Sequence, residues 1–284
     1  MNSHYFSQYL LSTEKLPAAE VIELLKRSVT LKSCLPIKAV RQGLVTPEQI
    51  ADIWQLPESE FMEKVTEAGF LTEAQVGTLL QTVGGESLCF AQAMLDSGKH
   101  SLAEVSSLFA EFDKAEVQPV KAAIEKLAGI ELENELPLYA DYADLFVRSL
   151  IRFMDTPAII NTAEPYLPPE GSTHIVSQAL LGDINLVTGL YAADEIFIEL
   201  ARRYSCEQIS TVDDLAKDSV TEFLNVLNGL FAVDLAKREM EVDLDAPKVA
   251  EDQEPFGNKQ MVVRIETGFG EFFMVMAVDE FVLA

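Results

Sequence analysis

One segment of this chain, from Asp218 to Gly229, carries polar residues whose types and spacing are suited to chemistry. At intervals of four, three and four residues it presents Asp218, Glu222, Asn225 and Gly229. On a helix, at about 100° per residue, these positions project within roughly 60° of one another. A carboxylate accepts hydrogen bonds and pairs with cations, whereas a carboxamide both donates and accepts. Such a row could hold a water molecule or a charged group of a partner.

The opposite face of the same segment is apolar, which predicts an amphipathic helix packed on a core. This stripe comprises Val220, Phe223, Leu224, Leu227, Leu230 and Phe231. Within the polar row, Asn225 and Gly229 are poor choices for a helix interior, glycine costing about 1 kcal/mol relative to alanine. Close approach of another molecule would explain them. A polar stripe on an amphipathic helix is more often a solvated face, and that alternative stays open.

Few other residue sets point to chemistry. His4, His100 and His174 are too scattered to build a nucleophile–base set or a metal site. His174 begins an expected strand and is interpreted as a satisfied edge residue. Gly84-Gly85 lacks the Lys-Ser/Thr that follows in a phosphate-binding loop. The three cysteines are odd in number and widely separated, so we expect buried, reduced thiols at Cys34, Cys89 and Cys206.

The composition narrows the classes of partner. The chain has 284 residues, 49% of them hydrophobic, and a formal net charge of −25. So acidic a chain argues against binding to nucleic acid or to anionic lipid, and it favours a partner that presents lysine or arginine. No apolar run approaches the ~18 residues of a membrane span, and the first residues do not resemble a secretion signal. We therefore expect a cytoplasmic protein.

The N-terminal half contains a repeat, seen in QGLVTPEQI, AGFLTEAQV and SGKHSLAEV. In each copy a glycine is expected to end one helix, and a capping box three residues later to begin the next. The glycines are Gly43, Gly69 and Gly98, and the boxes are Thr46–Gln49, Thr72–Gln75 and Ser101–Glu104. The buried stripe would then be formed by Ile50 and Ile53, Val76 and Leu79, and Val105 and Leu108. This pattern predicts stacked helical hairpins.

An acidic stretch ending in Pro137 interrupts the helical period, so we place the domain boundary near residue 135. Residues 1–135 form the helical-repeat domain, which offers no chemistry and is interpreted as a contact surface for a protein partner of unknown identity. Residues 136–284 form the second domain.

The second domain changes period, from helical to extended. Helices are expected at 139–154, 194–204 and 218–231, and strands at 158–166, 174–180, 184–191, 240–244, 260–266 and 271–278. Gly182-Asp183 is suited to the turn of a two-residue hairpin. The predicted fold class is α+β: helical hairpin repeats, then a mostly antiparallel sheet with helices packed on one face.

The polar row resembles the signature of the CheX/CheC phosphatases of bacterial chemotaxis. That signature has Asp or Ser, then Glu and Asn at these spacings, and a proline further on. Asp218, Glu222 and Asn225 match it, and Pro247 comes one residue earlier than in the signature. Gly229 matches a glycine that commonly follows the Asn. The resemblance covers roughly residues 137–284 and implies a CheX/CheC-like domain.

The resemblance also implies an activity, hydrolysis of the aspartyl phosphate on a CheY-like receiver domain. Asn225 would orient the attacking water and Glu222 would pair with the receiver's lysine. Asp218, Gly229 and Pro247 would take part in partner binding, Pro247 by shaping the chain after the fourth strand. No metal or cofactor of this chain's own is expected, since the receiver carries the Mg²⁺. A homodimer formed through sheet edges is also compatible with the resemblance.

Two questions remain open at this point, one about side-chain packing and one about function. Leu224, Leu230 and Phe231 stand where the family has smaller or more polar residues, and they either narrow access to the row or pack on the sheet. As to function, the alternative to a phosphatase is a non-catalytic adaptor that binds a response regulator, or another signalling protein, through the same face.

Overall fold

The computed structural model describes residues 5–31, 34–81, 85–129, 132–278 and 281–283. The chain forms two compact units, Met1–Val117 and Gln118–Ala284. The boundary expected near residue 135 thus lies inside the second unit. The reason is that α8 (Pro119–Leu127) packs against α9 (Leu136–Met154) and buries Val120 and Ile124.

The described part of the first unit is helical. Its helices are α1 (Phe6–Ser12), α2 (Ala18–Ser28), α3 (Leu35–Arg41), α4 (Glu58–Glu67), α5 (Glu73–Gln81), α6 (Glu86–Asp96) and α7 (Leu102–Lys114). Helix α2 packs against α6. Phe6 of α1 stacks on Phe109 of α7, their ring centroids 4.0 Å apart, and meets Phe90 of α6 edge-on. Aromatic packing therefore joins helices from both ends of the unit.

The three glycines of the repeat adopt the left-handed conformation that their sequence context predicts. Gly43, Gly69 and Gly98 have φ angles of 67°, 70° and 71° and follow α3, α4 and α6. In each capping box the backbone N–H of the hydroxyl residue donates to the Gln or Glu side chain, at 2.8, 2.8 and 2.7 Å. The reciprocal bonds measure 3.3, 3.3 and 3.2 Å. The predicted repeat is confirmed at these positions.

The first copy of the repeat departs from the prediction in one respect. Residues 47–55, which follow Thr46, form successive turns and not a regular helix. Several of their backbone hydrogen bonds span three residues, as from Ile53 N–H to the Ile50 carbonyl at 3.0 Å. Each predicted buried pair has one fully buried member, Ile50, Leu79 or Val105, and one that is half-buried.

The second unit is built on one sheet with strand order β1-β7-β8-β3-β2-β4, and β5 also pairs with β2. The strands of this sheet are β1 (Ala158–Ile160), β2 (Thr173–Gly182), β3 (Leu186–Ala193), β4 (Val242–Leu244), β5 (Lys248–Glu251), β7 (Met261–Thr267) and β8 (Gly270–Val278). Every pairing described is antiparallel. A small second sheet joins β6 (Pro255–Gly257) to β9 (Phe281–Leu283).

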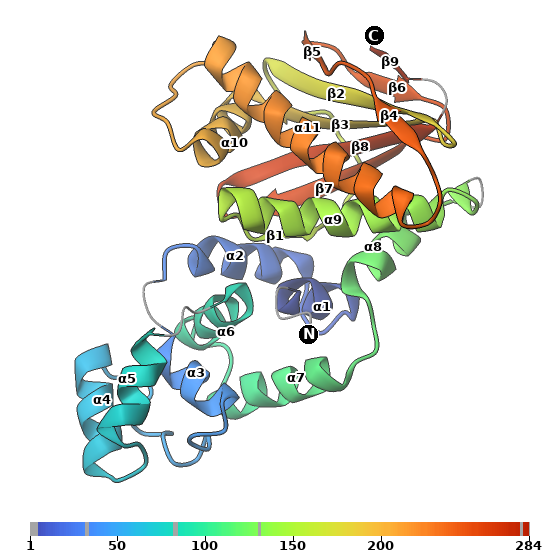
Figure 1. Ribbon diagram of the computed structural model, residues 1–284. Coiled ribbons are helices and arrows are strands. Elements are labelled where there is room, and N and C mark those ends of the chain that lie inside the picture. Colours follow the sequence, from blue (N-terminus) through green and yellow to red (C-terminus); the bar gives the residue numbers. More distant parts are fainter. Residues whose placement is uncertain (1–4, 32–33, 82–84, 130–131, 279–280, 284) are drawn as a thin grey trace. The chain divides into compact units, whose positions relative to one another are not determined.

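Three helices lie against one face of this sheet (Figure 1): α9, α10 (Asp194–Ser205) and α11 (Asp214–Ala236). The core between the layers contains Phe146 of α9, which meets Phe223 of α11 and Phe272 of β8 at about 6 Å. Helical repeats followed by a mostly antiparallel sheet with helices on one face is the predicted fold class, and it is confirmed.

Two details of the expected sheet are wrong. The first strand, β1, has three residues instead of nine, because only Ala158 to Ile160 pair with β7. Gly182 is not part of a two-residue turn. It pairs with Val242 of β4 at a φ of 156°, and a side chain there would lie 2.3 Å from the Glu241 carbonyl oxygen. Glycine is needed at this position because the β4 backbone approaches so closely.

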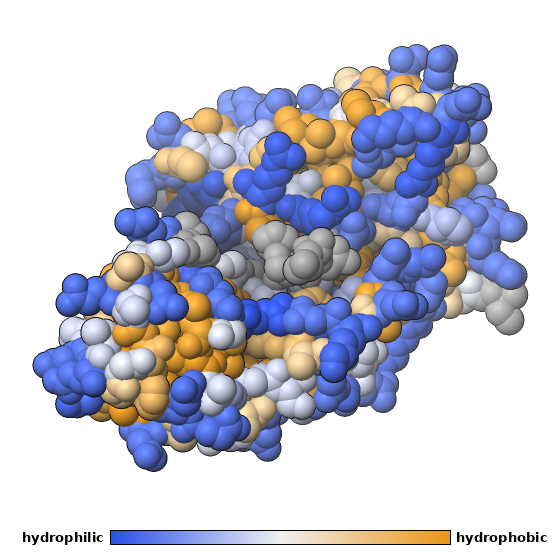
Figure 2. Space-filling view, turned by 60° about the horizontal axis from the view of Figure 1, so that its bottom comes forward, coloured by the Kyte–Doolittle hydropathy of each residue, from blue (hydrophilic) through white to orange (hydrophobic). Residues whose placement is uncertain are grey.

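The surface of the face shown in Figure 2 is largely hydrophilic, with hydrophobic residues gathered in patches. Within the described ranges, no helix combines the length and the apolar character that crossing a membrane requires.

Candidate functional site

Helix α11 is the element that carries the polar row. It begins at its N-cap Asp213, whose side chain accepts from the Ala216 N–H at 2.9 Å, and continues unbroken to Ala236. The predicted apolar stripe is buried except for Leu230, which is half-buried. Leu224 is fully buried and Phe231 packs edge-on against Tyr142, so both belong to the core and neither covers the row. Of the two alternatives for these side chains, packing on the core is thereby confirmed for Leu224 and Phe231.

The polar row itself is on the surface. Asp218 and Glu222 are exposed, and Asn225 and Gly229 are half-buried. A Cβ placed on Gly229 would meet no atom within 4 Å, so the space above this glycine is open. The row is therefore accessible to another molecule, as the spacing predicts.

Asn225 is held from below. Its Oδ1 accepts a hydrogen bond from Nε2 of Gln178 at 2.9 Å. Its Nδ2 lies 3.5 Å from Oε2 of Glu222, at the outer limit for a hydrogen bond. The carboxamide is thus bound firmly on its oxygen side and only weakly on its nitrogen side.

Gln178 is a residue that the sequence reasoning missed. It lies on β2, only 2% exposed, and its Nε2 also donates to the backbone carbonyl of Asp245 at 2.9 Å. The Asp245 N–H in turn donates to the Ala179 carbonyl at 2.9 Å. Pro247 lies in the loop between β4 and β5. Gln178 connects this loop to Asn225, because its Nε2 donates to both the Asp245 carbonyl and Asn225 Oδ1. The structure therefore brings the distant proline segment together with the helix row.

A second carboxamide extends this arrangement into the core. Asn228 is fully buried, and its Nδ2 donates to Oε1 of Gln178 at 2.9 Å. Its Oδ1 accepts from the hydroxyls of Tyr142, at 2.9 Å, and Thr188, at 3.0 Å. Burial raises the pKa of Tyr142, which keeps this hydroxyl a donor.

A signal for these buried residues was present in the sequence. Asn228 stands four residues after Leu224 and three before Phe231, and so lies on the apolar stripe. Gln178 alternates with Val176 and Leu180 on the buried face of β2. A polar residue at a core-facing position needs hydrogen-bond partners, and that need could have identified both carboxamides.

The electrostatic surroundings of the row are negative. Lys217, the neighbour of Asp218, is bound to Glu251 at 2.6 Å. Among the described residues, neither Asp218 nor Glu222 forms an ion pair. Burial chiefly, and the negative charge of nearby Glu222 in addition, raise the pKa of Tyr204 on α10. The uncompensated carboxylates favour a partner with a cationic group at this place.

The remaining sequence candidates form no second chemical site. His174 is not the satisfied edge residue expected, because β2 is paired with β3 on one side and with β5 on the other at this position. Its Nε2 lies 2.7 Å from Oδ1 of Asp194 and its ring packs on Phe197, whereas its Nδ1 is buried without a hydrogen-bond partner among the described residues. His4 lies outside the described residues. The expectation of buried thiols holds for Cys34, is met only in part at Cys89, which is half-buried, and is wrong for Cys206, which is exposed at the C-cap of α10. Within the described ranges, no three metal-binding side chains cluster as a site.

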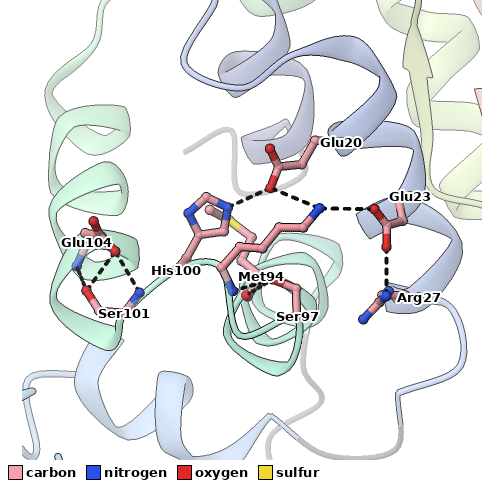
Figure 3. A network of polar contacts seen from close by, with 9 residues as sticks. Glu20, Glu23, Arg27, Met94, Ser97, His100, Ser101 and Glu104 are labelled. Carbon is pink, nitrogen blue, oxygen red and sulfur yellow. Dashed lines mark hydrogen bonds and ion pairs between the residues drawn. The ribbon is translucent and has the colours of Figure 1, made fainter.

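The first unit has a groove of about 590 Å³ beside the start of α7, with Trp54, Leu95 and His100 among its lining residues. Lys99 and His100, which both line the groove, take part in a polar network: His100 lies 3.0 Å from Glu20, and Lys99 reaches Glu23 at 3.3 Å. Glu20, Glu23 and His100 are labelled in Figure 3. Glu23 also binds Arg27 at 2.7 Å. These groups neutralise one another, and the network joins α2 to the turn between α6 and α7.

Comparison with known proteins gives structural neighbours only. No protein-family model matches the sequence, and no curated protein matches it either.

Several solved structures are similar in fold over about half of the chain. The chemotaxis protein CheX of Desulfovibrio desulfuricans is 14% identical, with a TM-score of 0.42, over 50% of this chain and 99% of that one. CheX of Vibrio vulnificus is 11% identical, with a TM-score of 0.41, over 48% and 95%. A chain of the CheX–CheY–BeF₃–Mg²⁺ complex of Borrelia burgdorferi is 18% identical, with a TM-score of 0.39, over 50% and 94%. At these values, function has to be inferred from the chain's own residues.

Proposed function

We propose that the second unit hydrolyses the aspartyl phosphate of a CheY-like receiver domain. The observation that carries this proposal is the state of Asn225. Its carboxamide is half-buried at the surface of α11 and bound on its oxygen side to Gln178. One helical turn away is Glu222, which is exposed and forms no ion pair with any residue that the structure describes. An accessible carboxamide one helical turn from an exposed carboxylate supports the role that the signature implies, in which the amide enters the partner's site.

Hydrolysis of an aspartyl phosphate requires few groups from this chain. An acyl phosphate is already activated, so its hydrolysis needs mainly a water molecule in line with phosphorus and neutralisation of charge. In this scheme Asn225 orients the water, because a carboxamide can donate to it and accept from it. Glu222 pairs with the receiver's lysine through a charge-assisted hydrogen bond. The receiver supplies the Mg²⁺.

The other members of the row have supporting roles. Asp218 adds negative charge at the docking face, and Gly229 leaves room above the helix for the partner's backbone or side chains. Pro247 shapes the loop that is joined to Asn225 through Gln178. The first unit would direct the protein to a site or partner in the cell.

The test is the rate of phosphate loss from a purified, phosphorylated CheY-like receiver, with and without this protein, across a panel of receivers. We expect Asn225→Ala to return the decay to its intrinsic rate while binding persists, because the methyl group cannot hold water. Glu222→Ala should weaken docking as well.

If the wild-type protein binds a receiver but accelerates phosphate loss from no receiver of the panel, the phosphatase proposal fails. The chain is then a non-catalytic adaptor that uses the same acidic face.

A further inference from the structure

The orientation of the Asn225 carboxamide can be deduced from one backbone carbonyl. The carbonyl oxygen of Asp245 can only accept a hydrogen bond, so the end of Gln178 that faces it must be the NH₂ group. The same NH₂ group faces Asn225, at 2.9 Å. Asn225 must therefore present its oxygen to Gln178 and turn its own NH₂ group away from the sheet.

The orientation of Asn228 follows from that of Gln178. The oxygen of Gln178 faces Asn228, so Asn228 must donate a hydrogen bond from its NH₂ group, at 2.9 Å. The oxygen of Asn228 then receives the hydroxyl protons of Tyr142 and Thr188. Both N–H groups of Gln178 and its oxygen are engaged, and the residue is 2% exposed. This buried network is rigid, because rotating any of its carboxamides would break a hydrogen bond and leave a buried polar group unpaired.

We propose that Gln178 is the positioning residue of this site: it holds Asn225 with its oxygen inward and its NH₂ group toward the partner. Gln178 touches neither the receiver nor the water and acts through Asn225. The kinetic part of this inference rests on the proposed function, whereas the orientation itself does not.

The orientation matters because an amide that fixes a water molecule must present known donors and acceptors. One N–H of Asn225 lies near Glu222, and the other has no partner among the described residues. Its Oδ1 keeps a second acceptor position beside the bond from Gln178. Without Gln178 the amide would rotate and sample both orientations, and fewer encounters with the receiver would place the water correctly.

Gln178→Met tests this inference, since methionine fills a similar volume and donates nothing. We expect kcat for receiver dephosphorylation to fall by roughly tenfold, with KM and binding of the BeF₃-activated receiver unchanged. Gln260→Met is the matched control. The Gln260 side chain also donates to a backbone carbonyl, that of Pro255 at 3.0 Å, but lies outside the row, so its loss should leave kcat unchanged.

A second measurement does not depend on activity. In nuclear magnetic resonance spectra, the side-chain NH₂ signals of Asn225 should be sharp and ordered in the wild type and in Gln260→Met, and broadened in Gln178→Met. Should Gln178→Met fail to fold, Gln178→Glu decides, because it keeps the acceptor for Asn228 and loses both donors. Its carboxylate can only accept from Asn225, so the amide turns over. Reduced kcat with shifted Asn225 NH₂ signals then upholds the inference, and full kcat with unshifted signals overturns it.

If the wild-type protein is active and the Gln178 variant has the same kcat, the inference is overturned. If the wild type is inactive on every receiver, the proposed function fails and the amide signals alone decide. Broadening in the Gln178 variant then upholds the positioning role, and unchanged signals refute it.

Discussion

The two units order their polar side chains over very different distances along the chain. In the first unit the capping boxes join residues three apart, as in Ser101 and Glu104. In the second unit the bonds around Gln178 and Asn228 span 47, 50, 67 and 86 residues. Local bonds therefore define helix ends in the first unit, whereas tertiary packing orders the candidate site in the second.

The largest expected effect is that of Asn228→Leu. The change removes three hydrogen bonds and leaves two buried hydroxyls and the Gln178 oxygen without their partner, at a cost of about 3 kcal/mol or more. Denaturant unfolding followed by circular dichroism should show the loss. Fluorescence of Trp54, the single tryptophan, reports the first unit and should keep its midpoint.

The control for that change is Asn225→Leu, the same substitution three residues earlier at a half-buried position. It should cost less than half as much free energy. Equal losses at the two positions would show that the buried network is not what stabilises the second unit.

Breaking a local bond should have a smaller effect. We expect Ser101→Ala to destabilise the first unit by about 1 kcal/mol, because α7 loses its capping box, and Ser101→Gly by only a few tenths. Trp54 fluorescence during denaturant unfolding measures both. Receiver dephosphorylation should not change, and a change in it would mean that the units are coupled.

A gain in stability is expected from Gly229→Ala. Nothing lies within 4 Å of the added methyl group, so the helix gains up to about 1 kcal/mol in propensity. If the glycine provides clearance for the receiver, KM should rise. Gly77→Ala, in α5 and equally open, should stabilise the first unit by a similar amount and leave KM alone. A receiver KM unchanged by Gly229→Ala would remove this glycine from the docking face.

The smallest effect expected depends on pH. Burial chiefly raises the pKa of Glu266 above 4.5, against the hydrogen bond that Asn161 donates at 3.0 Å. The folded protein therefore binds this proton more tightly than the unfolded chain, and the stability present below pH 4.5 is lost as the pH rises through the folded pKa.

Glu266→Gln keeps the neutral form and an acceptor for Asn161 at every pH. It should be more stable than the wild type at neutral pH and no more stable in acid, measured by denaturant unfolding at both. Lower stability of the variant at neutral pH would show that the carboxylate is the stabilising form.

Much of the second unit was predictable at the level of elements, and less so at the level of contacts. Helix α11 and its surface row followed from a period of 3.6 residues, and β7 and β8 from extended apolar runs. Strand β5 was not expected, since three of its four residues are exposed, only two of them are apolar, and the strand is held by pairing with β2. The catalytic roles of Asn225 and Glu222 remain predictions.

The amino-acid sequence was sufficient to place the repeat glycines and the capping boxes and to identify the residues that share the polar row. These features depend on backbone geometry within one or two helical turns. The contacts of the three carboxamides depend on the tertiary structure, which places Gln178 of β2 beneath Asn225 and Asn228 and pairs it with both. A hydrogen bond between residues far apart in the chain depends on sheet register and on how the helix seats on the sheet. Neither is a local property of the residues that the bond joins.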